Sequence, residues 1–230
     1  MTTTVVIPIK QLKDAKQRLG SLLSAAERGA LFQAMVEDVL EAVTTCDRID
    51  EVLIVTDDPQ AALIGHQYSA RVIAEPLIPG LINAVTYASQ LLREEGVNTM
   101  MFLPGDVPLV TVEELEVMLD GFGQGTVAAF GIVPAADLGG SNCVVCSPPD
   151  CMTFGFGEDS FRRHLQLARS CGIEPMVAKL PGIGLDVDTP ADLVELANVL
   201  SRLQLKTHTQ RFLQNSGVLA NLPTDVASTG

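Results

Sequence analysis

The sequence predicts an α/β protein whose sheet is mixed but mostly parallel and is covered by helices on both faces. Apolar strand-like runs alternate with helical segments of about 10–15 residues. The runs are continuously apolar, which is typical of strands buried on both faces. The chain has 230 residues, and no repeat or linker divides residues 1–205. We therefore expect one domain over 1–205 and an accessory, partly disordered tail over 206–230.

The strands are predicted from β-branched and apolar runs that end at turn residues. The first run contains Val5, Val6 and Ile7 and reaches Pro8, and a later one stops before Pro104. Ligands bind beyond the carboxyl ends of the strands in such sheets, so the residues after each run matter most. The expected strands lie at 5–9, 51–56, 70–74, 99–103, 127–132 and 143–146.

The helices are predicted from start signals and from apolar residues at helical spacing. Ser24 and Glu27 have the spacing of a capping box, and a periodic apolar pattern follows between 31 and 43. A helix of about a dozen residues follows the turn at 57–59. Further helices are expected at 83–93, from 111 onward, at 162–171 and at 191–203.

Composition limits the partners of this protein. The net charge is −13, from 28 acidic and 15 basic residues. A field of this sign repels nucleic acid and anionic membranes, so neither is an expected partner. No apolar run reaches the length of about 18 residues that a membrane span needs. The first four residues lack the basic start of a signal peptide, and we expect a cytoplasmic location.

Cysteines and histidines give little indication of chemistry. Five cysteines are an odd number in a chain of this size, which argues against a disulfide framework. Cys143 and Cys146 have a zinc-like spacing, but no second pair accompanies them, and buried thiols are the preferred interpretation. His66, His164 and His208 are isolated along the chain, so a hydrolase triad is not indicated.

Four cations follow the first strand within nine residues: Lys10, Lys13, Lys16 and Arg18. In an acidic α/β protein, a basic cluster at the carboxyl end of a strand indicates an anionic ligand, with phosphate as the leading candidate. Lys10, Lys16 and Arg18 are the candidates for neutralising a triphosphate and for stabilising charge on a transferred group. We expect Lys13 to face solvent. The alternative is a solvated basic helix start.

Three aspartates are candidate ligands of Mg²⁺. Asp106 follows the strand at 99–103 and lies between Gly105 and a rigid Pro. Asp186 and Asp188 lie two residues apart in an expected extended segment, so their carboxylates point to one side at a separation of about 6.5–7 Å. The alternatives are a turn aspartate at 106 and a helix cap at 188, ahead of Pro190.

Two loops combine bare backbone amides with a hydroxyl, at 139–142 and 157–160. Such loops cradle phosphate, and Ser160 lies at a helix start where the dipole favours an anion. Glu158 and Asp159 would repel that anion unless they turn outward. Cations, clustered acids and these loops together indicate metal-assisted phosphoryl or nucleotidyl transfer. No P-loop and no dinucleotide-binding Gly pattern is present in the sequence.

Taken in order, the motifs resemble one family over residues 5–200. They are Pro8-x-Lys10-x₄-Ala15-Lys16-x-Arg18-Leu19, Gly105-Asp106-x-Pro108-Leu109, Gly139-Gly140-Ser141-Asn142, Phe156-Gly157-x-Asp159-Ser160 and Leu185-Asp186-x-Asp188-Thr189-Pro190-x-Asp192-Leu193. This set is similar to the CofC/FbiD guanylyltransferases of coenzyme F420 biosynthesis. The resemblance implies a GT-A-like, Rossmann-like nucleotidyltransferase fold and a homodimer. It also implies transfer of GMP from GTP to the phosphate of phosphoenolpyruvate, 2-phospho-L-lactate or 3-phospho-D-glycerate, with release of pyrophosphate.

The resemblance also implies roles for individual residues. It assigns Mg²⁺ to Asp106, Asp186 and Asp188. It assigns the acceptor to Ser141, Gly157 and Ser160. It assigns nucleotide binding to Pro8, Lys10, Asn83 and Gly105. Two features depart from the family pattern: Ser stands at 141 where relatives often have Thr, and Gly80-Leu81-Ile82-Asn83 is one residue longer than the usual segment.

Two alternatives stay open at this point. The first is another nucleotidyltransferase of the same fold, of the sugar-nucleotide or molybdenum-cofactor type. Those enzymes typically have a Gly-rich first loop, whereas no Gly precedes Gly20 here. The second is a non-catalytic nucleotide-binding regulator, which the presence of acids and cations at every motif disfavours.

Overall fold

The computed structural model describes residues 1–123 and 127–221, and it contains a seven-stranded sheet in the order β3-β2-β1-β4-β6-β5-β7. The strands are β1 Thr3–Pro8, β2 Glu51–Val55, β3 Arg71–Ile73, β4 Thr99–Phe102, β5 Ala129–Pro134, β6 Ser141–Ser147 and β7 Met176–Val177. Only β6 runs antiparallel to its neighbours, β4 and β5, among the strands described. The predicted mixed, mostly parallel sheet is confirmed.

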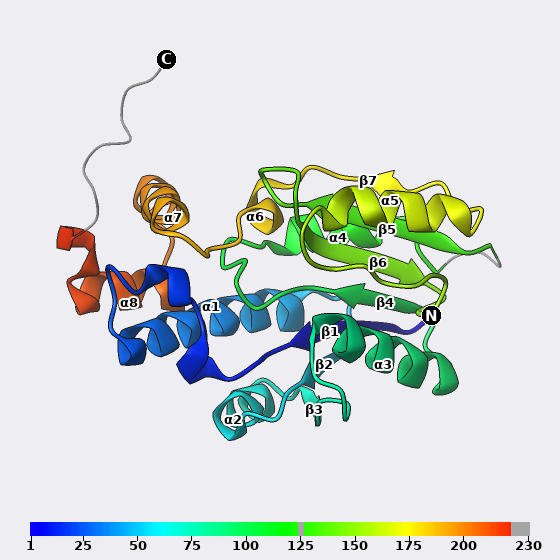
Figure 1. Ribbon diagram of the computed structural model, residues 1–230, viewed down its shortest axis with the longest axis horizontal. Helices are drawn as coiled ribbons and strands as arrows, with labels where there is room; N and C mark the ends of the chain where they lie inside the picture. The colour runs from blue at the N-terminus through cyan, green and yellow to red at the C-terminus, as the bar shows by residue number, and fades with distance from the viewer. Residues whose placement is uncertain (124–126, 222–230) are drawn as a thin grey trace, which may run out of the picture.

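Helices cover both faces of this sheet, as predicted. They are α1 Ala25–Thr45, α2 Pro59–Gln67, α3 Leu81–Glu94, α4 Val112–Leu119, α5 Ser160–Ser170, α6 Pro181–Gly184, α7 Pro190–Leu203 and α8 His208–Ser216. The helices α1, α2 and α4 share one apolar cluster with the sheet, and α3 and α5 share another on the opposite face. Figure 1 shows α3 and α5 on the viewer's side of the strands.

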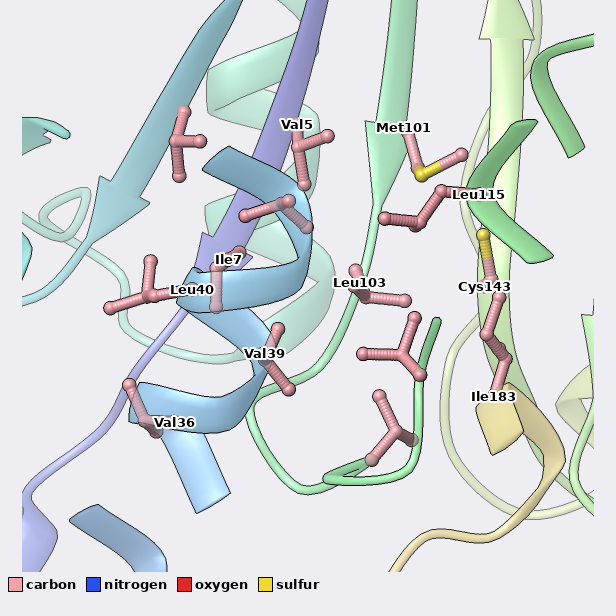
Figure 2. Close-up of a cluster of buried hydrophobic side chains, with 14 of the residues drawn as sticks. Val5, Ile7, Val36, Val39, Leu40, Met101, Leu103, Leu115, Cys143 and Ile183 are labelled. Atoms are coloured by element: carbon pink, nitrogen blue, oxygen red, sulfur yellow. The ribbon is translucent and has the colours of Figure 1, made fainter. Parts of the chain in front are cut away.

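The central strand β1 shows why the sheet is buried on both faces. Val5 and Ile7 point toward α1, whereas Val6 between them belongs to the cluster under α3. Figure 2 shows the α1 side, where Val36 and Val39 lie against this strand. Each fully buried aliphatic side chain of this size stabilises the fold by about 1.5–3 kcal/mol. The continuously apolar sequence of β1 follows from this double burial.

Local signals also place the helix starts. The predicted capping box of α1 is present, because Ser24 Oγ accepts from the backbone N–H of Glu27 and the Glu27 carboxylate accepts from the N–H of Ser24. Cys143 and Cys146 are free thiols in β6 and both are buried, as predicted. Among the described residues, no helix combines the length and apolar character that crossing a bilayer requires.

The sequence did not predict β7, α6 or α8. The helix α8 lies inside the segment expected to be accessory, and it packs against α1. Its Thr209 and Leu213 are buried, and the Asp38 carboxylate of α1 accepts the backbone N–H groups of His208 and Thr209. This part of the segment therefore belongs to the folded body, while residues 222–230 of the expected disordered tail lie outside the described residues.

Candidate active site

A cavity of about 670 Å³ opens beyond the carboxyl ends of β1 and β4. Parallel α/β sheets bind ligands at this edge. The turn after β1 forms one side, and Gly105 and Asp106 after β4 form another. The cavity is lined by Pro8, Ile9, Lys10, Gln11, Asp14, Ala15, Lys16, Gln17, Phe32, Glu75, Gly80, Leu81, Ala84, Phe102, Pro104, Gly105, Asp106 and Asp188.

Lys16 joins two of the predicted metal ligands at the base of this cavity. Its Nζ lies 2.6 Å from Asp106 Oδ2 and 2.6 Å from Asp188 Oδ1. The same ammonium lies 5.5 Å from the centre of the Phe32 ring. The lysine side chain is only 4% exposed. Residues that are 90 and 172 positions away along the chain thus meet at one cation.

The backbone of Lys16 is shaped to direct this side chain inward. Lys16 has φ 53°, a left-handed conformation, and lies between the short 3₁₀ helices Leu12–Asp14 and Gln17–Leu19. A non-Gly residue in this conformation costs about 1 kcal/mol, and the conformation brings the ammonium group to both aspartates. Burial opposes the lysine charge, but Asp106 and Asp188 outweigh it, so the pKa of Lys16 is raised.

Asp106 provides a direct test of whether a cation fits here. Its Oδ2 contacts Lys16, while its Oδ1 is buried without a hydrogen-bond partner among the described residues. A buried carboxylate oxygen left unpaired is costly, and a hard divalent cation would satisfy it. The backbone N–H of Val187 donates to the Asp106 carbonyl at 3.1 Å, which holds the segment of Asp186 and Asp188 beside it. Carboxylate oxygens are the donors that Mg²⁺ prefers. Among the described residues, however, Asp106, Asp186 and Asp188 do not bring one oxygen each within 4.8 Å of one another, and Lys16 Nζ contacts two of them.

Asp186 lies deeper in this acidic group. Its Oδ1 accepts a 2.9 Å hydrogen bond from Asn142 Nδ2, and Asn142 also donates to the carbonyls of Ile183 and Gly184. Burial raises the pKa of Asp186, and the nearby charges of Asp106 and Asp188 add to that rise. A bound cation would stabilise the ionised form of this carboxyl group, because burial and the neighbouring negative charges disfavour that form.

The structure excludes one of the two interpretations of Asp188, that of a helix cap. The cap of α7 is Thr189, whose Oγ1 accepts from the N–H of Asp192 while the Asp192 carboxylate accepts from the N–H of Thr189. Asp188 therefore contributes no side chain to the helix cap. Its carboxylate is 47% exposed and points to Lys16 at the cavity.

The charge balance of the cavity differs from the expectation of a basic cluster. Two ammonium groups, Lys10 and Lys16, face four carboxylates, from Asp14, Glu75, Asp106 and Asp188. An excess of negative charge repels a triphosphate. Anion binding here requires an additional cation, which is consistent with the unpaired oxygen of Asp106.

The two Gly-containing loops lie together, as their proposed joint role requires. The N–H of Phe161 donates to the Gly139 carbonyl at 3.3 Å. Ser160 begins α5, and its hydroxyl donates to Ser141 Oγ at 3.2 Å. Glu158 and Asp159 are exposed, and Asp159 pairs with Arg162, so these acids do turn outward.

The loops at 139–142 and 157–160 connect to the cavity through Phe156 and, indirectly, through Asp186, which lies two residues before the lining residue Asp188. The ring of Phe156, next to Gly157, lies 4.5 Å from the ring of Phe102, which lines the cavity. Asn142, next to Ser141, donates to Asp186. Gly157 has φ 109° and open space around its Cα, so a ligand can approach its backbone closely.

Six of the predicted site residues do not line this cavity: Arg18, Asn83, Ser141, Gly157, Ser160 and Asp186. Arg18 is exposed in the turn Gln17–Leu19, in which Leu19 is the side chain that turns into the core. Asn83 is exposed on α3, where Leu81 and Ala84, three residues apart, share the face toward the cavity. Lys13 is exposed, as expected. Pro8, Lys10 and Gly105 do line the cavity.

The sequence did not single out three residues that hold the loops of Ser141 and Ser160 in place. His164 is buried at 0% exposure and contacts Ser141 Oγ. Arg163 donates to the carbonyls of Gly155, Phe156 and Glu158 and so clamps the loop. The third is Asn142, described above. No local signal marks them, although the Gly139–Asn142 motif does contain Asn142.

A separate acidic group lies between α1 and α8. Ligand atoms of Asp38, Glu41 and His208 lie within 4.8 Å of one another. His208 Nδ1 also lies 3.0 Å from Glu37 Oε2. None of these residues lines the cavity. Their contacts join α8 to α1.

Comparison with known proteins identifies the family. The sequence profile described as "Guanylyl transferase CofC like" matches residues 3–222. A phosphoenolpyruvate guanylyltransferase of Conexibacter woesei is 35% identical over 214 residues, which cover 93% of this chain and 96% of that protein. A 3-phospho-D-glycerate guanylyltransferase of Colwellia psychrerythraea is 32% identical over 197 residues, 86% of this chain and 92% of that one.

A solved structure supports the fold independently. A candidate nucleotide-diphospho-sugar transferase from Desulfovibrio desulfuricans G20 superposes with a TM-score of 0.78, covering 98% of this chain and 100% of that one at 18% identity. Identity this low supports the fold alone, and the expected GT-A-like arrangement is confirmed. The protein described here is an enzyme of the nucleotidyltransferase class and belongs to the CofC-like guanylyltransferase family.

Proposed function

We propose that this enzyme transfers GMP from GTP to the phosphate of a small three-carbon phospho-acid and releases pyrophosphate, within coenzyme F420 biosynthesis. Phosphoenolpyruvate is the first acceptor to test, because the Conexibacter relative carries that name. The supporting observation is the junction of two groups of residues. The cavity with Lys16, Asp106 and Asp188 adjoins the loops of Ser141 and Ser160 through the hydrogen bond from Asn142 to Asp186.

The nucleotide is proposed to occupy the cavity at the ends of β1 and β4. The nucleotide would approach the backbone of Pro8 and Gly105 closely. Lys10 and Lys16 would supply positive charge to its triphosphate. Arg18 and Asn83 lie outside the lining, so this proposal assigns the charge compensation to the two lysines. Lys16 is already fixed by its two ion pairs, and a preorganised cation needs no reorientation during the reaction.

Asp106, Asp186 and Asp188 are proposed to hold Mg²⁺. When bound, the ion would offset charge on the transferring group and on the departing pyrophosphate. The negative lining of the cavity and the unpaired Oδ1 of Asp106 both support this role.

The acceptor is proposed to lie against Ser141, Gly157 and Ser160. Its phosphate oxygen would attack the α-phosphorus of GTP in line. A new P–O bond then forms, and the bond to the oxygen of the β-phosphate breaks, so pyrophosphate leaves with that electron pair. No general base is required, because a phosphate is already ionised at neutral pH. The imidazole next to Ser141 is a weak base, because burial lowers the pKa of His164 to about 4.

The experiment uses the purified full-length protein with GTP, Mg²⁺ and each of the three phospho-acids in separate reactions. Pyrophosphate release and the mass of the guanylylated product are measured, with CTP, ATP and UTP as nucleotide controls. Asp188→Asn is the matched inactive variant, because it removes a charge without removing a helix cap. Absence of product with all three acids would refute the assignment.

A further inference from the structure

A buried set of polar groups lies beneath the loop that carries Ser141. Ser141 Oγ lies 2.9 Å from His164 Nδ1 and accepts from Ser160 Oγ at 3.2 Å. The backbone N–H of Gly155 donates to His164 Nε2 at 2.9 Å. The three side chains are between 0% and 9% exposed, so their hydrogen bonds are made within the protein.

The hydrogen bond from Gly155 determines the tautomer of His164. A neutral imidazole has one protonated nitrogen and one unprotonated nitrogen. Because Nε2 accepts from Gly155, the proton lies on Nδ1, which then donates to Ser141 Oγ. Burial, together with the charge of Arg163, lowers the pKa of His164 to about 4, which keeps the ring neutral at physiological pH.

Ser141 consequently has a fixed hydrogen-bonding direction. A hydroxyl oxygen offers two lone pairs and one proton. His164 and Ser160 are both donors to this oxygen, so both lone pairs are occupied. The Ser141 proton is left for donation to a ligand. A carboxylate or phosphate oxygen can accept it, whereas an ammonium or amide nitrogen, which has no free lone pair, cannot.

We propose that His164 is a positioning residue that makes Ser141 an obligatory hydrogen-bond donor to an oxyanion of the phospho-acid. The inference rests on the proposed function, because that function places the acceptor at Ser141. His164 acts through Ser141 and does not touch the reacting atoms. It thereby gives the acceptor site a preference for oxyanions over isosteric groups that can only donate hydrogen bonds.

Two substitutions separate the two hydrogen bonds of His164. In His164→Gln the side-chain amide reaches the position of Nε2, so it accepts from Gly155 but leaves no donor for Ser141. In His164→Asn the amide lies at the position of Nδ1, so it donates to Ser141 but leaves Gly155 without an acceptor. The two variants are therefore matched controls for each other.

We expect His164→Gln to raise the KM for the phospho-acid about tenfold, with the KM for GTP unchanged, because one lone pair of Ser141 then loses its donor and the hydroxyl can rotate its proton away from the ligand. We expect His164→Asn to keep the acceptor KM within about threefold of the unmodified enzyme while lowering the melting temperature. Equal acceptor KM values for the two variants would overturn the proposal. So would additive effects of Ser141→Ala and His164→Gln in the double variant, because removing Ser141 should leave His164 nothing to position.

A second measurement does not depend on whether any variant folds. It uses nitrogen NMR of the histidine side chains in the unmodified full-length protein to find which ring nitrogen of His164 is protonated. A proton on Nδ1 of His164 supports the proposal, and a proton on Nε2 overturns it. This measurement also separates the two levels of inference. If the protein transfers guanylyl to none of the three acids, the proposed function fails, whereas the tautomer still decides whether Ser141 is held as a donor.

Discussion

Lowering the pH should destabilise this protein through His164, and the size of the effect follows from its burial. The pKa of His164 falls from 6.5 to about 4 in the folded state, first because the ring is buried and second because of the Arg163 charge. The unfolded chain therefore binds a proton at a pH where the folded protein does not. The stability from this group is fully present above about pH 6.5 and is lost as the pH falls toward 4.

The full difference corresponds to about 3 kcal/mol, at about 1.4 kcal/mol per pKa unit. Of this, about 2 kcal/mol should be lost between about pH 7.5 and about pH 5. Asp38, Glu114 and Asp186 have raised pKa values from burial and act in the opposite sense over part of this range. The prediction therefore concerns a difference between the unmodified protein and His164→Gln, which retains these acids but cannot titrate at 164.

The assay is equilibrium urea unfolding of both proteins at the two pH values. We expect the unmodified protein to lose about 2 kcal/mol more than His164→Gln on acidification. Urea slopes that agree between the two proteins would show that the free energies are comparable. The same pH dependence in both proteins would refute the reasoning, because His164 would then titrate normally in the folded state.

Three further changes test other contacts. Lys16→Met should destabilise the fold by about 3 kcal/mol, because Asp106 and Asp188 then face each other without a cation, and Mg²⁺ should restore part of the loss in thermal melts. An unchanged melting temperature would contradict this. Asp188→Asn should abolish pyrophosphate release with little loss of stability, whereas Thr189→Ala should lower stability by about 1 kcal/mol and leave turnover close to normal. Turnover near normal in Asp188→Asn would remove it from the proposed metal site. Asp38→Ala should expose the amides of α8 to hydrogen exchange and cost about 2 kcal/mol of stability, because two backbone N–H groups lose their acceptor. Unchanged protection of α8 would show that its packing alone holds it.

Much of the site could be predicted from sequence because its residues follow strand ends. A buried strand such as β1 or β4 is recognisable from its composition, and topology alone then brings Lys16 and Asp106 to the same edge of the sheet. The sequence also places Asp188 with Asp106 as a candidate ligand, and both carboxylates contact Lys16 in the structure, although the sequence does not predict that lysine contact. The motif order carried this information even where each motif was short.

The supporting contacts could not be predicted, because they depend on packing rather than on local pattern. His164 and Ser141 are 23 residues apart and meet only because α5 lies over the end of β6. The helix α8 has two fully buried residues, Thr209 and Leu213, so its apolar periodicity is too weak to identify. Arg18 was grouped with Lys16 by charge, but the direction of its side chain depends on the turn that buries Leu19.

The alternation of side chains around Asp186 has a consequence for how the protein can be shortened. Leu185 and Val187 are buried in an apolar cluster with Leu213 and Val218, which come from α8 and the turn after it. Asp186 between them, and Asp188 after them, are thus held in part by the far end of the chain. Trimming the protein after residue 205 would delete none of the proposed ligands, yet it would remove Leu213 and Val218 from the cluster that anchors that loop. Researchers who design shortened forms for crystallisation or fusion should keep α8, because its loss would resemble an active-site defect.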